Sequence, residues 1–164
     1  MADLPWYRDR AVWRLILHGY LRWLAALNLV WEVAHVRLYT LWNEATPAYI
    51  AFSVLHCTLG DVLIGGAALL VALILGREGA LANWRWARLV LLTTISAVGY
   101  TVFSEWMNIT LLRSWRYSEA MPVLGFGGFE IGVTPLAQWL FVPAFALYSS
   151  RWRARRAARR APGG

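Results

Sequence analysis

The chain has 164 residues, of which 59% are hydrophobic and only 15% charged, and its formal net charge is +7. A small domain has too much surface for its volume to bury such an excess of apolar side chains, which argues against a soluble globule and against disorder. The single cysteine, Cys57, excludes an internal disulfide framework and a cysteine-rich metal site. The composition therefore predicts a small polytopic membrane protein.

Residues 1–22 form the first predicted unit. Arg10, Arg14 and Arg22 are separated by mostly apolar residues, a pattern typical of an amphipathic helix that lies in the membrane interface. A signal peptide is not expected here, because no apolar core leads to a cleavage site of small residues.

Four apolar segments follow, each close to the roughly 20 residues that cross a bilayer. They cover about residues 23–42, 49–76, 87–112 and 131–150. The first is the least apolar, because it contains Glu32, His35 and Arg37. The sequence therefore predicts an all-α, integral membrane four-helix bundle over residues 23–150. An interfacial amphipathic helix precedes it, and a basic tail, residues 151–164, follows.

The arginine residues predict the orientation of the bundle. If both termini lie on one side of the membrane, that side holds 13 arginines and the other holds only Arg37, Arg113 and Arg116. The positive-inside rule then places both termini in the cytoplasm of a bacterial inner membrane. The basic tail is interpreted as a topology signal that contacts anionic lipid, and no nucleic-acid partner is expected.

Polar residues inside the apolar segments carry the functional prediction, because they are costly there and usually face a protein interior or a cavity. On the first span, Asn28, Glu32, His35 and Tyr39 recur at helical spacing and share one face. The polar residues that the other three spans contribute are His56, Asp61, Thr94, Thr101, Glu105, Asn108 and Gln138.

The depth of these residues in the membrane predicts that they meet. His35 and His56 lie at similar distances from the connection between the first two spans, roughly 10 Å below the outer surface. Any one of these residues alone can have a purely structural role, as a hydrogen bond that joins two helices. Together, however, they indicate a cavity that opens outward. Its predicted lining is Glu32, His35, His56, Asp61, Glu105 and Asn108, with pocket walls from Asn28, Trp31, Tyr39, Trp106, Trp115, Tyr117 and Gln138.

One chemistry that this set can support is metal binding. Glu32 and His35 form a Glu-x-x-His pair, which carboxylate bundles combine with carboxylates from facing helices. His35, His56 and Asp61 are the predicted ligands, and a transition metal such as Zn or Fe fits these side chains.

The second chemistry is acid–base catalysis without a metal. A carboxyl group in an apolar cavity can hold a proton at neutral pH and give it to a substrate, while a second carboxylate removes one. Glu32 and Glu105 are the predicted acid–base pair, and aromatic walls can stabilise a carbocation through their π faces.

Residues 100–148 carry further elements in a defined order. These are Glu105-Trp106, Trp115-Arg116-Tyr117, Gly132, and a helix start with Pro135, Gln138, Phe141 and Pro143. In this order they resemble the lycopene cyclase domain of membrane carotenoid enzymes, whose pair of glutamates falls on Ala137 and Gln138 here. The Trp31-Glu32 pair also resembles an element of integral-membrane terpene cyclases. The whole chain is similar to small bacterial four-span membrane proteins.

These observations together predict an intramembrane enzyme that acts on an apolar, lipid or isoprenoid-like substrate. The alternative is an accessory subunit of a membrane complex that binds a metal, cofactor or pigment without catalysis. Membrane lipids and an apolar small molecule are the expected partners in the first case, and other membrane subunits join them in the second.

Overall fold

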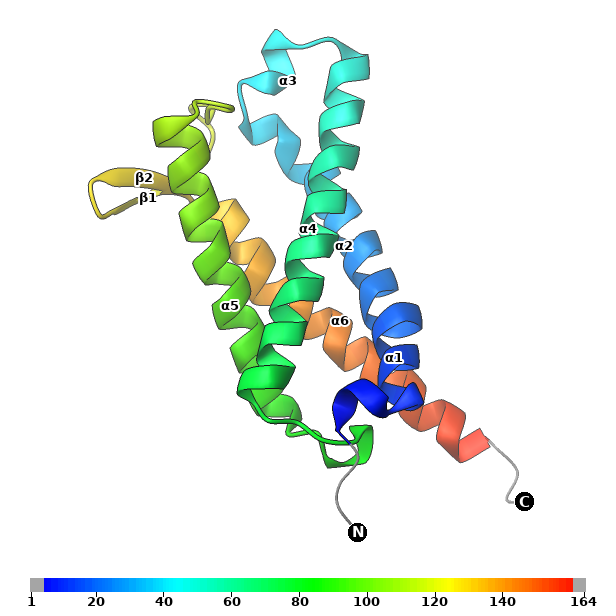
Figure 1. Cartoon of the computed structure of the whole chain (residues 1–164). Helices are drawn as coiled ribbons and strands as arrows, with labels where there is room; N and C mark the ends of the chain where they lie inside the picture. The colour runs from blue at the N-terminus through cyan, green and yellow to red at the C-terminus, as the bar shows by residue number, and fades with distance from the viewer. Residues whose placement is uncertain (1–4, 161–164) are drawn as a thin grey trace.

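The computed structural model describes residues 5–160, most of which lie in helices (Figure 1). The four long helices are α2 (Leu21–His35), α4 (Pro47–Leu75), α5 (Trp86–Trp106) and α6 (Val133–Arg160). Helices α4 and α6 each pack against both α2 and α5. Every long helix therefore has two neighbours, which is the arrangement of a four-helix bundle, and the predicted all-α class is confirmed.

Two of these helices are long and apolar enough to cross a membrane. The first is α4, with a mean hydropathy of 2.2. The second is Trp86–Leu111, which consists of α5 and the π-helical turn η5 (Met107–Leu111) and has a mean hydropathy of 1.4. Only 33% and 22% of their most apolar stretches are buried inside the protein, whereas the core helix of a soluble protein is mostly buried. Within residues 5–160, length and composition thus support two spans, and the four-span bundle stays a prediction.

The N-terminal segment is continuous with the bundle. Asp9 caps α1 (Arg10–Leu15) by accepting the N–H of Ala11 at 2.8 Å, and it also accepts the N–H of Leu81 at 3.0 Å. The π-helical turn η2 (Ile16–Tyr20) then leads into α2 without a break. The apolar side chains of this segment, among them Val12, Leu15 and Ile16, are buried in the same hydrophobic core as Leu24 of α2.

The hydrophobic core fills the half of the bundle that contains α1 and the α4–α5 connection. Tyr20 is fully buried there and donates its hydroxyl hydrogen to the carbonyl oxygen of Gly65 at 3.0 Å. A Cβ at Gly65 would lie 2.5 Å from Cδ2 of the fully buried Leu24, so any larger residue here would force the Leu24 side chain to move. The buried members of this core include Val12, Leu15, Ile16, Leu69, Leu73, Leu89, Val142 and Leu147.

The first predicted span ends earlier than expected, because its last residues pair with a distant part of the chain. Helix α2 stops at His35 and is followed by the short turns η3 (Val36–Leu38) and α3 (Leu41–Glu44). Residues 38–40 run beside residues 116–118, with Ser118 N donating to Leu38 O at 2.9 Å and Thr40 N to Arg116 O at 3.0 Å. We call these two paired segments the clasp.

The predicted connection 113–130 contains a β-hairpin. Strands β1 (Val123–Phe126) and β2 (Phe129–Gly132) pair antiparallel around Gly127 and Gly128, whose φ angles of 57° and 89° suit a tight two-residue turn. Helix α6 consequently begins at Val133 instead of residue 131. It continues to Arg160, so the first ten residues of the predicted tail are helical, and residues 161–164 lie outside the described part.

Candidate functional site

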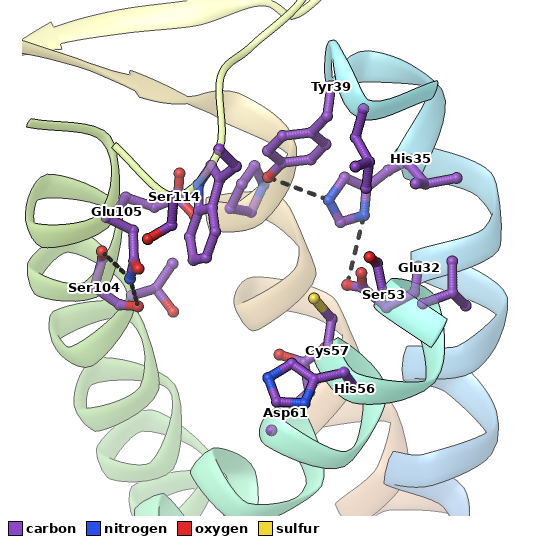
Figure 2. Close-up of a pocket in the computed structure, with 18 of the residues that line it drawn as sticks. Glu32, His35, Tyr39, Ser53, His56, Cys57, Asp61, Ser104, Glu105 and Ser114 are labelled. Atoms are coloured by element: carbon purple, nitrogen blue, oxygen red, sulfur yellow. Dashed lines mark hydrogen bonds and ion pairs between the residues drawn. The ribbon is translucent and has the colours of Figure 1, made fainter. Parts of the chain in front are cut away.

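A cavity of about 740 Å³ lies between the four long helices at the end of the bundle that carries the clasp (Figure 2). This volume is within the usual range for small-molecule sites. All five ionisable residues predicted for the site line this cavity, namely Glu32, His35, His56, Asp61 and Glu105. The structure therefore brings together groups from α2, α4 and α5 that are far apart in the sequence.

Gln138 of α6 is the hydrogen-bond donor that joins three helices below the cavity. Its side chain is 3% exposed, and its Nε2 donates to Asp61 Oδ2 at 2.8 Å and to Asn28 Oδ1 at 2.9 Å. Glu32 Oε1 is a more distant third acceptor at 3.4 Å. Because an amide nitrogen carries only two hydrogens, this nitrogen is fully used by its neighbours on α2 and α4.

Glu32 and Asp61 form an acid pair on one side of the cavity. Both carboxyl groups accept from the same nitrogen, Nε2 of Gln138, Asp61 Oδ2 at 2.8 Å and Glu32 Oε1 at 3.4 Å. Two carboxyl groups held this close repel each other when both are ionised, which favours one proton shared between them. The acid pair is therefore arranged as a proton donor, as in other sites where two carboxyl groups share one proton.

His35 lies beside the acid pair. His35 is only 8% exposed. Its Nδ1 is 3.7 Å from Glu32 Oε1, and its Nε2 is 3.4 Å from the hydroxyl of Tyr39 (Figure 2). The ring of Tyr39 packs in turn on that of Tyr117, with 5.6 Å between the ring centroids. The imidazole thus separates the acid pair from the tyrosines of the clasp.

Glu105 occupies the opposite wall, on α5 (Figure 2). The Tyr117 hydroxyl donates to Glu105 Oε2 and accepts the N–H of Gly132 at 2.8 Å. Burial and the adjacent Glu105 carboxyl raise the pKa of Tyr117, which keeps it a neutral phenol that donates to Glu105. A Cβ at Gly132 would lie 3.1 Å from Tyr117 Cζ, so this close approach favours glycine.

The structure divides the residues predicted for the pocket into those that line the cavity and those that lie outside it. Tyr39, Asn108, Trp115 and Gln138 line the cavity, whereas Asn28, Trp31, Trp106 and Tyr117 do not. Asn28 is fully buried beneath Gln138, and Tyr117 stands behind Glu105. Trp31 packs against the hydrophobic core, and Trp106 is 37% exposed on the outside of α5.

The predicted metal ligands do not converge. His35, His56 and Asp61 border the same cavity, but no group of three or more His, Cys, Asp or Glu side chains in residues 5–160 is placed to hold a metal ion. Asp61 is engaged with Gln138, His35 faces Tyr39, and the exposed His56 stacks on Phe52 at 5.7 Å between ring centroids.

Sequence reasoning missed the clasp end of the cavity. Arg113, Ser114 and Arg116 line it there, together with Glu44. A signal for them was present, because Arg113 and Arg116 are two of the three arginines on the side of the membrane predicted to be poor in arginine. Cys57 also lines the cavity.

Comparisons with known proteins assign this chain to no family. No protein-family model matches the chain, and no match was found among curated proteins or solved structures. The class of protein is therefore defined by its fold and cavity: a four-helix bundle with two membrane-length helices and an acid-lined cavity at one end.

Proposed function

We propose that this protein is a multi-pass enzyme of the bacterial inner membrane that acts on an apolar, isoprenoid-like lipid by acid–base catalysis. The observation that carries this proposal is the placement of two separate acidic groups around one cavity. Gln138 brings together Glu32 of α2 and Asp61 of α4, and Glu105 stands on the opposite wall.

The proposed reaction needs no oxidant or reductant. The acid pair gives its proton to one carbon of a C=C bond, whose π electrons form the new C–H bond and leave a carbocation on the other carbon. Glu105 as a carboxylate then removes a proton from a carbon next to the cation, and that C–H electron pair forms a new C=C bond. Tyr39, Trp115 and Trp139 line the cavity and stabilise the cation through their π faces. The product is an isomer of the substrate.

The test is proton uptake from solvent. Membranes with and without the intact gene are incubated in D₂O with a total lipid extract, and the apolar lipids are analysed by mass spectrometry. We expect a lipid species whose mass rises by one deuterium only where the protein is present, because the new C–H bond takes its hydrogen from the exchangeable acid pair. Lipids that bind to the purified protein but carry no gene-dependent deuterium would favour the non-catalytic accessory subunit instead.

The proposed orientation places the cavity toward the outer face and both termini in the cytoplasm. Reporter fusions after Glu44 and after Glu119 are expected to report the periplasm, since both positions lie at the clasp end. A fusion after Glu78, in the α4–α5 connection, is expected to report the cytoplasm. The opposite pattern, measured with paired phosphatase and fluorescent-protein reporters, would overturn the orientation.

A further inference from the structure

The proposed chemistry leaves the arginines at the clasp end of the cavity unexplained. Arg113 and Arg116 line this end, whereas the acid pair lines the deep end. Both Tyr49 and Asp61 of α4 border the cavity, and a helix segment of that length spans roughly 18 Å. The cavity is therefore long, with cationic side chains at its entrance and carboxyl groups at depth.

The two arginines differ in what they bind. Arg116 Nη2 contacts both carboxylate oxygens of Glu44, at 3.2 Å and 3.1 Å, and is thereby neutralised. Arg113 makes no hydrogen bond or ion pair with any other residue in the described range 5–160. It follows η5 with a φ of 51°, and Ser114 N donates to Asn108 O at 2.9 Å to close this turn. Arg113 is thus an exposed, uncompensated cation at the entrance.

We propose that the substrate is a phosphorylated amphiphile whose phosphate binds Arg113 and whose hydrocarbon chain reaches the acid pair. This inference rests on the proposed function for the deep end of the cavity. A guanidinium group suits phosphate because it offers parallel N–H donors that match the phosphate oxygens. The carboxyl groups at depth repel the anionic end, so the amphiphile binds in one orientation, with its apolar chain inward.

The experiment compares two ligands that differ only in the phosphate. The full chain is placed in phosphatidylcholine nanodiscs, and binding of farnesyl phosphate, farnesol and inorganic phosphate is measured by calorimetry. We expect farnesyl phosphate to bind at least tenfold more tightly than farnesol. Arg113→Gln should reduce this preference to about twofold or less. Arg37→Gln is the matched control, because Arg37 stacks on Trp42, with 5.1 Å to the ring centroid, and does not line the cavity.

A second variant tests whether a lost preference for phosphate comes from the missing guanidinium group or from misfolding. Arg113→Gly suits the left-handed backbone at this position, so it should fold at least as well as the natural protein and still lose the preference for phosphate. Equal binding of farnesyl phosphate and farnesol to the natural protein would overturn the proposal, as would an equal loss in Arg37→Gln. Inorganic phosphate that binds as tightly as farnesyl phosphate would also overturn it, in favour of a free-phosphate site.

This outcome is separable from that of the proposed function. If the phosphate preference fails while gene-dependent deuterium labelling persists, the enzyme acts on a neutral lipid and only the headgroup assignment is wrong. If labelling fails while the phosphate preference holds, the cavity binds phosphorylated amphiphiles without converting them.

Discussion

Glu105→Gln and Glu32→Gln are each expected to abolish the lipid change that depends on the gene, while protein abundance and thermal stability stay close to wild type. A glutamine has the size of glutamate, and its amide oxygen can still accept from Tyr117 at position 105 or from Gln138 at position 32. It cannot give or take a proton, and general acid–base catalysis is typically worth about 10²–10⁴-fold in rate. The measurement is complementation of a deletion strain, with deuterium labelling as the quantitative assay.

Glu119→Gln is the matched control for these two variants, because Glu119 is an exposed carboxylate outside the cavity. It should complement fully. Normal complementation by both Glu105→Gln and Glu32→Gln would refute the catalytic role of the acids. Loss of either protein from the membrane would instead assign that glutamate a structural role.

Gln138→Leu is expected to lower the free energy of unfolding by about 3 kcal/mol. The leucine is of similar size but removes the only amide nitrogen that Asp61, Asn28 and Glu32 share. The three acceptors, of which Asn28 and Glu32 are buried, then lose the hydrogen-bond donor that they share. The measurement is chemical or thermal unfolding of the purified protein in detergent, followed by circular dichroism.

Asn108→Leu provides the comparison. Asn108 is also an amide that lines the cavity, but its hydrogen bonds go to Ser104 O at 2.9 Å and Ser104 Oγ at 3.3 Å, one turn earlier in the same helical segment. Its replacement removes no contact between helices and should cost less than about 1 kcal/mol. Similar losses in the two variants would show that Gln138 does not join the helices energetically.

The sequence was most informative where a pattern repeats locally. The second and third apolar segments, predicted at 49–76 and 87–112, correspond to α4 and to Trp86–Leu111 within two residues at each end. Helical spacing also identified the faces of α2 and α5 that carry Glu32, His35 and Glu105. The same spacing could have excluded Trp31 and Trp106 from the cavity, because each adjoins a cavity glutamate and is turned about 100° away from it.

The features that were missed depend on contacts between distant residues. Helix α2 ends early because residues 38–40 pair with residues 116–118, and no local pattern reveals such a pairing. The central position of Gln138 depends on how α6 packs against α2 and α4, so its amide looked like one polar residue among many. The helical tail was missed because its arginines were interpreted as a topology signal, although arginine is also a good helix former.

The clasp has a consequence for how this protein can vary. Its two flanking hydrogen bonds join main-chain atoms of Leu38 and Thr40 to those of Ser118 and Arg116. Main-chain pairing tolerates most side chains at Leu38, Thr40 and Ser118, so mutations at these three positions can accumulate without changing the distance between the walls that carry Glu32 and Glu105, whereas Tyr39 and Tyr117 are constrained by their contacts with His35 and Glu105. Side chains on α4, such as Phe52 and Ile64, also line the cavity and are free to change its shape. The architecture thus separates a sequence-tolerant frame from a wall on which selectivity for new ligands can evolve.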